Sequence, residues 1–285
     1  MAEHHDPHPF EHVMDTKVWE FFSNAFGDKK EIALPGFHIP FGSHTYHFQI
    51  TKFMILEVVA AILILLIYVP MARRVRTGEL PKGRWWNAFE SLLTFVRNEI
   101  AKPNLGEHDA DKYVPYLWTL FLFLLFCNLL GMFPFMGSPT ASIWVTGALA
   151  CISFLMIHGA AAVKMGPVHY IQSMWPHIDV PYVGWFFSLM IFIIEFISTG
   201  IKSGVLAVRL FANMFAGHMV LAVILLFIVT AARQPNVWLL GGVSVASVLG
   251  VVALSLLELF VAFLQAYIFV FLTALFMGMS LHPEH

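Results

Sequence analysis

The sequence predicts an all-α polytopic membrane protein with about five membrane-embedded helices and one amphipathic helix at the membrane surface. Hydrophobic residues make up 59% of the 285-residue chain and charged residues only 12%, about half the ~25% usual in soluble domains. The apolar residues gather in runs about as long as the ~20 residues that cross a bilayer as a helix. These features exclude a water-soluble globule, and the formal net charge of −2 gives no indication of nucleic-acid binding.

Residues 1–51 form a polar-to-mixed N-terminal region, and residues 52–285 form the membrane domain. Apolar side chains at helical spacing over residues 10–22 predict an amphipathic helix. Pro-Gly and Gly-Ser pairs within residues 32–50 indicate a short hairpin or extended loop. Near the start lie His4, His5, His8 and His12. They could bind a metal, but solvated disorder is favoured because no Cys or ordered spacing accompanies them. The start has no signal-peptide pattern and should stay on the mature protein.

Residues 53–69 form the first predicted span, which Pro70 should end. The basic residues that follow, Arg73, Arg74 and Arg76, place the next loop on the cytoplasmic side of the membrane.

The middle of the chain adds one surface helix and two spans. Residues 80–104 carry apolar side chains at helical spacing with charges on the other face, which predicts a helix lying along the membrane surface. Residues 116–136 and 141–163 form two spans joined by a turn at residues 137–139. Lys164 then marks the return to the cytoplasmic side.

Residues 182–233 contain no proline and no polar turn, yet a helix of this length is ~75 Å long, more than twice the ~30 Å hydrocarbon thickness. The segment either breaks near Gly200 and Gly204 into two spans or is one helix far from the membrane normal; we favour one helix. Residues 237–281 are a second overlong segment, so residues 182–281 should form an antiparallel hairpin of two long, steeply inclined helices. Counting the crossings places the N-terminus outside and the C-terminus in the cytoplasm.

Ionisable and amide side chains interrupt this apolar hairpin. A charge at mid-span costs ~2.5 to 3.5 kcal/mol even on the mildest scale, so these side chains must face protein, water or each other. The candidates for a proton path are Glu195, Lys202, Arg209, Asn213, His218, Glu258 and Gln265.

Helix geometry groups these candidates by face. Glu195, Lys202 and Arg209 are seven residues apart and share one stripe, with Asn213 one turn further on nearly the same face. His218 lies about half a turn round from Arg209. The first long helix can therefore present a cation to one environment and an imidazole to another.

Glu258 and Gln265 are also seven apart and share a face of the second long helix. His, Glu, Gln and Asn exchange protons near neutral pH or hold water by hydrogen bonds, whereas Arg209 keeps its proton and acts as a fixed charge. A fixed cation beside a proton path repels the conducted ion and favours the ionised form of a nearby carboxylate. This combination suits a gate.

Simpler roles stay open for several candidates. Arg209 could snorkel to an interface or form a structural ion pair, and Glu195 and Lys202 could pair with one another. Asn213 and Gln265 could only join neighbouring helices.

The stretch RLFANMFAGH, residues 209–218, closely resembles the core motif of subunit a of F-type ATP synthases. The segment ELFVAFLQAYIFVFLTALFMGMSL, from Glu258, resembles the last helix of that family, and NLLGMFPF, from Asn128, resembles the end of an earlier span. The resemblance covers nearly all of the chain after the N-terminal region. The family's two steeply inclined helices agree with the predicted hairpin.

The resemblance implies that Arg209 is the arginine that faces a rotating ring of c subunits and separates two offset half-channels. Glu195 and Lys202 would lie towards the cytoplasmic exit. The entry half-channel from the outer side would be lined by Asn213, His218, Glu258 and Gln265. In some relatives the acid and the histidine are exchanged, and others carry an acid where this chain has Gly131, which therefore has no assigned role.

The resemblance also implies partners: a c-ring, b-type peripheral-stalk subunits, the rest of the ATP synthase complex and membrane lipid, with no nucleic acid. The chain has no phosphate-binding loop and no zinc-protease motif, so we expect no catalytic residue, cofactor or metal, and ATP chemistry belongs to partner subunits. The expected location is a bacterial inner membrane. The alternatives are a proton-coupled secondary transporter, which would typically show paired repeats with broken helices, and a scaffold without an ion path.

Overall fold

The structure is a computed structural model that describes residues 18–20, 31–33, 35–41, 44–76, 83–133, 137–173, 184–232 and 237–282. The chain forms two compact units, each assembled from segments distant in the sequence. Unit 1 comprises Met1–Val69, Phe123–Ser142 and Phe211–Leu264, and unit 2 comprises Pro70–Leu122, Ile143–Leu210 and Gln265–His285. Each unit is described by itself below.

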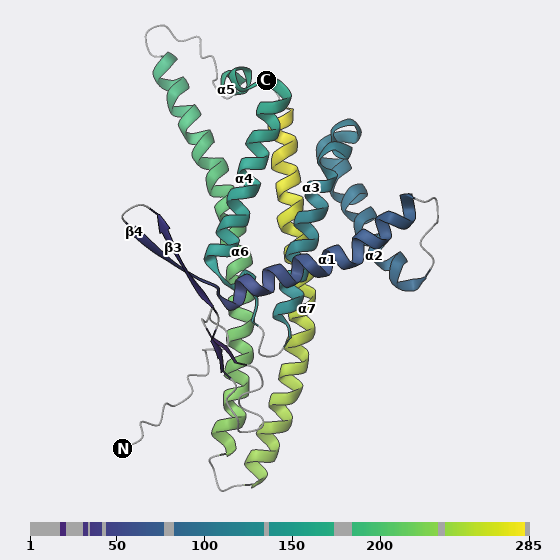
Figure 1. Ribbon diagram of the computed structural model, residues 1–285, viewed down its shortest axis with the longest axis vertical. Helices are drawn as coiled ribbons and strands as arrows, with labels where there is room; N and C mark the ends of the chain where they lie inside the picture. The colour runs from purple at the N-terminus through teal and green to yellow at the C-terminus, as the bar shows by residue number, and fades with distance from the viewer. Residues whose placement is uncertain are drawn as a thin grey trace. The chain divides into compact units, whose positions relative to one another are not determined.

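Helices dominate the described residues, and five of them are long and apolar enough to cross a membrane. This confirms the predicted all-α polytopic class. In chain order the helices are α1 (Lys52–Arg76), α2 (Arg84–Phe95), the π-helix η2 (Val96–Ala101), α3 (Lys102–Gly131), the 3-10 helix η3 (Pro139–Ala141), α4 (Ile143–Met165), α5 (Pro167–Ser173), α6 (Gly184–Ala232) and α7 (Val237–Leu281) (Figure 1).

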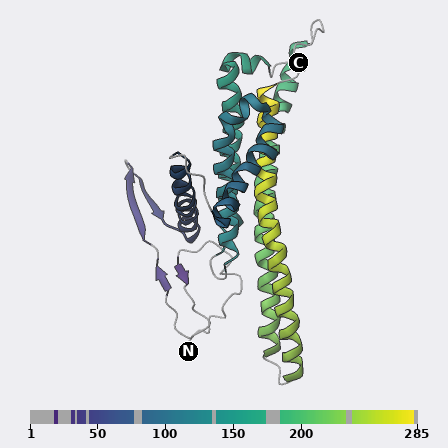
Figure 2. The ribbon, with the colours of Figure 1, turned by 90° about the vertical axis from the view of Figure 1, so that its right-hand side faces the viewer.

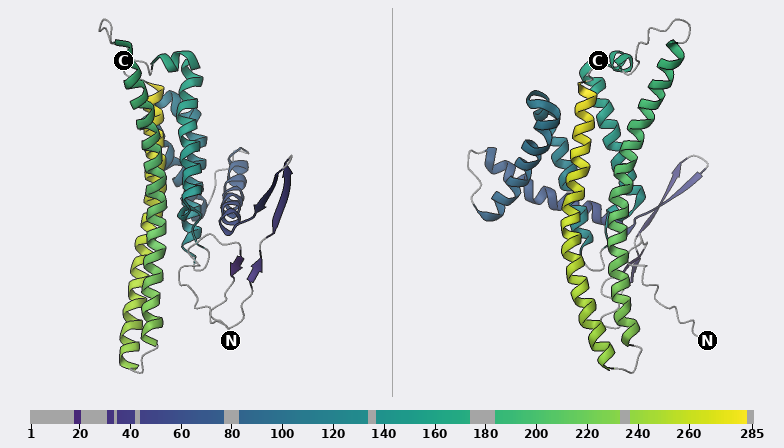
Figure 3. Two further views of the ribbon diagram at one scale, coloured as in Figure 1. Left: turned by 90° about the vertical axis from the view of Figure 1, so that its left-hand side faces the viewer. Right: turned by 180° about the vertical axis from the view of Figure 1, so that it is seen from behind.

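The described parts of the N-terminal region are short antiparallel strands. β1 (Val18–Glu20) pairs with β2 (Glu31–Ala33), and β3 (Gly36–Phe41) pairs with β4 (His44–Gln49), the latter pair being visible as a hairpin in Figure 3. The prediction of a helix over residues 10–22 is wrong at β1. Backbone pairing with β2 outweighs the helical spacing of the apolar residues there. The rest of that prediction, and the four histidines near the start, lie outside the described residues.

The first span continues through Pro70 instead of ending there, since α1 extends to Arg76. A proline removes one intrahelical hydrogen bond, but helices within membranes tolerate it. Within unit 1, α1 packs on α3 through Ala60, Cys127 and Leu130. The predicted end of the first span was therefore wrong by two turns, while its identity as a span is confirmed.

The predicted surface helix corresponds to α2 and η2, and α2 contains no buried residue. The chain runs on into α3, which is kinked at Gly106, where the φ of 78° lies in the left-handed region that favours glycine. Arg97 donates two hydrogen bonds, of 3.0 and 3.1 Å, to the Asp111 carboxylate on the far side of Gly106. The Trp118 indole also donates to the Leu93 carbonyl oxygen at 2.7 Å, so α2 is fixed against α3 within unit 2.

The span predicted over residues 116–136 ends earlier, at Gly131. A Cβ atom at position 131 would overlap Ser138, so a glycine here lets the end of α3 touch the returning chain. Gly137 has a φ of 70°, and η3 then leads into α4. The 3-10 helix η3 therefore covers part of the predicted turn, and the second span, α4, begins at Ile143 instead of residue 141.

Helices α6 and α7 contain 49 and 45 residues and are continuous. The break considered near Gly200 and Gly204 does not occur. Within unit 1, Gly217 lies against Glu258 and Ile224 against Gly250. The contact partner on α7 moves to lower residue numbers as the position on α6 moves to higher ones. These segments therefore run antiparallel and side by side, as Figure 2 also shows. The inclination of both helices to a membrane stays a prediction.

Candidate functional site

The His218 imidazole of α6 and the Glu258 carboxylate of α7 face each other in unit 1. The His218 Nδ1 atom lies 3.8 Å from Glu258 Oε1, and the two side chains are 12% and 8% exposed. This distance is beyond a direct hydrogen bond. Among the described residues, neither His218 Nε2 nor Glu258 Oε1 has a hydrogen-bond partner. Two titratable groups with unused hydrogen-bonding capacity therefore meet at a seam between two long apolar helices.

Gly217 makes the space in which the Glu258 carboxylate lies. A Cβ atom at position 217 would come within 2.6 Å of Glu258 Oε1 and 3.2 Å of its carboxyl carbon. Any larger residue would displace the carboxylate. Sequence reasoning missed this residue, although its place directly before His218 is a signal that could have drawn attention to it.

A buried chain of hydrogen bonds joins the end of α3 to α7 in the same unit. The Asn128 amide nitrogen donates to the Ala262 carbonyl oxygen at 3.1 Å, and the Thr140 hydroxyl donates to Asn128 Oδ1 at 2.7 Å. Ser138 Oγ lies 2.6 Å from Thr140 Oγ1. Sequence reasoning quoted Asn128 only as part of a motif and did not consider Thr140 or Ser138. Polar residues beside an apolar span were the available signal.

Lys52 is a further residue that sequence reasoning did not consider. It is the first residue of α1 and is only 4% exposed. A buried lysine at the start of α1 therefore belongs to the same unit as the titratable pair.

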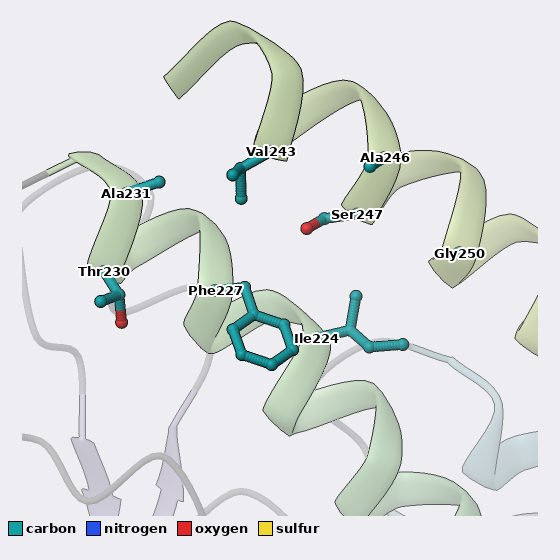
Figure 4. A pocket seen from close by; sticks show the side chains of 8 residues that line it. All are labelled: Ile224, Phe227, Thr230, Ala231, Val243, Ala246, Ser247 and Gly250. Atoms are coloured by element: carbon teal, nitrogen blue, oxygen red, sulfur yellow. The ribbon is translucent and has the colours of Figure 1, made fainter. Parts of the chain in front are cut away.

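Nearer the connection between α6 and α7, a cavity of about 490 Å³ lies along the same seam. Figure 4 shows Phe227 and Ile224 of α6 opposite Val243 and Ser247 of α7. The lining is mainly apolar, with the Ser247 hydroxyl as one of its few polar groups.

The Arg209 side chain, in unit 2, lies on an exposed face of α6. Large apolar side chains flank it on this face, with Val205 47% and Val208 55% exposed. Among the described residues, Arg209 has no ion-pair or hydrogen-bond partner. Lys202 is exposed on the same helix, with its Nζ atom 5.4 Å from the centroid of the Phe276 ring.

The other predicted site residues differ in their surroundings. Gln265 is buried in unit 2, only 5% exposed, whereas Asn213 is exposed on the unit 1 part of α6. Glu195 belongs to α6, but its side chain lies outside what the structure describes. Of the seven candidates, the structure brings His218 and Glu258 together. In the part of the chain that the structure describes, no three His, Cys, Asp or Glu side chains group as metal ligands.

Comparison with known proteins gives one consistent result. The family model described as ATP synthase A chain matches residues 54–278. A protein of Myxococcus xanthus named ATP synthase subunit a is 38% identical over 239 residues, covering 83% of this chain and 74% of the relative. One of Chlorobium phaeobacteroides with the same name is 37% identical over 278 residues, covering 96% and 75%.

A third relative, from Anaeromyxobacter sp., is 40% identical over 228 residues and is also named ATP synthase subunit a. The alignment covers 80% of this chain but only 53% of that relative. The chain therefore spans about half the length of this relative and about three quarters of the other two.

Proposed function

The chain belongs to the ATP synthase A chain family, and we propose that it is the stationary proton-translocating subunit in the membrane sector of an F-type ATP synthase. It has no nucleotide site of its own and acts as a channel component, while ATP chemistry takes place in partner subunits. Its partners are the c-ring, b-type peripheral-stalk subunits and the rest of the complex.

The observation that carries this proposal is an arginine that has no partner among the described residues and lies on an apolar, exposed helix face. A guanidinium at mid-membrane depth is costly, and Arg209 has no counter-charge among the described residues to offset that cost. The exposed Val205 and Val208 beside it fit contact with an apolar partner surface. A carboxylate that moves past on a c-ring would provide the missing counter-charge.

The buried pair of His218 and Glu258 supports the entry half-channel. A proton from the outer side passes along α6 and α7 by way of these two groups, with Asn213 and Gln265 as hydrogen-bonding side chains along the route. The proton then neutralises a ring carboxylate, which can enter lipid at much lower cost than its charged form.

The exit half-channel lies towards the cytoplasm and includes Glu195 and Lys202. A ring carboxyl that returns to the subunit meets the field of Arg209, which favours the ionised form, so the proton is released to the exit side. Because Arg209 cannot give up its own proton, it separates the half-channels and blocks direct leakage. Each charge that crosses contributes ~2.3 kcal/mol per 100 mV, so several crossings are needed for one ATP.

The proposal includes an orientation in a bacterial inner membrane. Residues 1–51 lie on the outer side, residues 52–285 form the membrane domain with its proton path in residues 182–281, and the C-terminus is cytoplasmic. The support is the basic cluster at the end of α1, with Arg73, Arg74 and Arg76 in its last turn, since such clusters stay on the cytoplasmic side.

The decisive experiment is proton pumping by the assembled complex in reconstituted vesicles, with Arg209→Ala and Arg209→Lys compared with the parent. Arg209→Ala should abolish coupled pumping while the complex still assembles. Arg209→Lys should also be strongly impaired, because an ammonium releases its proton when desolvated and a guanidinium does not. Assembly is measured separately by co-purification with the c-ring.

Three outcomes separate the candidate functions. Complexes of Arg209→Ala that still pump would remove the gate and would favour a scaffold without an ion path. A parent protein that transports protons without co-purifying with a c-ring would favour a secondary transporter. Loss of pumping in assembled complexes supports the proposal.

A further inference from the structure

The polar chain formed by Ser138, Thr140 and Asn128 is fully buried, with each of the three residues 0% exposed. Its direction follows from the hydrogen-bonding capacity of each group. Thr140 gives its one hydroxyl proton to Asn128 Oδ1, so Ser138 must donate to Thr140. Asn128 then donates to the Ala262 carbonyl oxygen. Hydrogen bonds that point the same way along a chain strengthen one another in a buried setting.

This polar chain ends on α7, one helical turn from Glu258. Ala262 is four residues after Glu258, on the same side of the helix. Asn128 therefore binds the backbone of the turn that follows the carboxylate. The bond adds to the ordinary bond within the helix and joins α7 to the end of α3.

A packing contact lies at the same level on α6. Met214, four residues before His218, packs with Ala262 and with Ala141, the neighbour of Thr140, and all three are buried. Gly131 lets the end of α3 touch Ser138, which holds the first hydroxyl of the chain in place. The separation of α6 and α7 is thus fixed one turn away from both His218 and Glu258.

The geometry points to the Ser138–Thr140–Asn128 chain as a positioning device that holds the α7 turn carrying Glu258 at its distance from the His218 imidazole. This inference rests on the proposed function, in which these two groups pass protons. The three polar residues do not carry protons themselves. They act through the backbone of α7, and their hydroxyl and amide groups are needed for that reason.

The test measures how exposed position 258 is in the assembled complex. In a Cys151→Ser background, which removes the exposed native thiol, the rate at which N-ethylmaleimide labels Glu258→Cys is compared with and without Thr140→Val. Loss of the Thr140 hydroxyl should raise the labelling rate about fivefold, the factor for one ordinary hydrogen bond.

Two further variants distinguish the hydroxyl from the size of the side chain. Thr140→Ser keeps the hydroxyl, and its labelling rate should equal that of the parent in this test, the Cys151→Ser, Glu258→Cys protein with native Thr140. Thr273→Val is the matched control, because Thr273 is equally buried but donates only to the Phe269 carbonyl oxygen of its own helix. It should label like the parent. Equal labelling in Thr140→Val and the parent, or equal increases in Thr140→Val and Thr140→Ser, would overturn the inference.

If Thr140→Val does not assemble, Ser138→Ala takes its place, since it leaves the bonds from Thr140 and Asn128 intact. Labelling should then rise about twofold, because only the outer hydrogen bond is lost. An unchanged rate would overturn the inference.

Proton pumping with the native Glu258 separates this inference from the proposed function. Thr140→Val should lower pumping and Thr140→Ser should restore it, while Glu258→Gln should abolish it. Normal pumping in Glu258→Gln would overturn both the proposed proton path and the role of the Ser138–Thr140–Asn128 hydrogen bonds in it. Lost pumping in Glu258→Gln with parent-like pumping in Thr140→Val would overturn the positioning role alone.

Discussion

At the scale of single residues, the separation of His218 from Glu258 matters most. Direct proton transfer needs donor and acceptor within ~2.6 to 3.2 Å, and these atoms lie 3.8 Å apart. Neither His218 Nε2 nor Glu258 Oε1 has a hydrogen-bond partner among the described residues. Proton transfer between the two groups therefore requires a side-chain movement or one bridging water.

Gly217→Ala should strongly reduce proton pumping, because the new methyl group would lie where the Glu258 carboxylate now lies. The carboxylate is the free end of a flexible side chain, so we expect it to shift from this position, which changes its distance from the His218 imidazole. Pumping per assembled complex is the measurement.

Gly250→Ala is the matched control in the same seam, since its Cβ atom would meet only Ile224 Cδ1, at 3.9 Å, which is ordinary contact. It should pump like the parent. If both alanine variants pump normally, the carboxylate does not need the place that Gly217 provides.

At the scale of helices, the backbones of α7 and α3 approach each other closely at one point in unit 2. A Cβ atom at Gly278 of α7 would overlap the Asn104 carbonyl oxygen of α3. Nearby, Lys164 at the end of α4 donates to the Asp109 carboxylate of α3 at 2.6 Å and lies 3.0 Å from His282 Nε2. The ends of α3, α4 and α7 therefore meet through one glycine contact and one polar cluster.

Gly278→Ala should destabilise the protein, because rigid backbone has to give way, at a cost of roughly 1 to 3 kcal/mol. Thermal unfolding of the purified protein in detergent measures this, with Gly159→Ala of α4 as the control. An added Cβ atom at Gly159 meets nothing within 4 Å. Equal unfolding temperatures for the two variants would show that α7 does not depend on this approach to α3.

At the scale of the whole molecule, the five candidate spans found among the described residues and the basic end of α1 predict the orientation of the chain. An odd number of crossings puts the two termini on opposite sides. We expect a tag at the N-terminus to be reached by protease only from outside, and a tag at the C-terminus only from the cytoplasmic side. Intact cells compared with inverted vesicles provide the measurement, and tags on the same side would contradict the orientation.

Composition and periodicity predicted most of the fold. The overlong apolar segments were correctly interpreted as two continuous helices, because a segment without proline or a polar turn has no reason to break. Helix ends were less predictable. Pro70 did not end α1, since a helix in an apolar setting keeps its remaining hydrogen bonds. β1 replaced part of a predicted helix because its backbone pairs with β2, a contact that local helical spacing does not reveal.

The sequence by itself determined the membrane class, the long helices and the choice of His218 and Glu258 as candidates, because burying a charged group among apolar residues is costly and therefore conspicuous in any sequence. Only the tertiary structure decided that Gly217 makes room for the carboxylate and that Asn128 binds the α7 backbone at Ala262. The physical reason is that these contacts join residues far apart in the chain, and they depend on distances between helices that no local pattern of residues encodes.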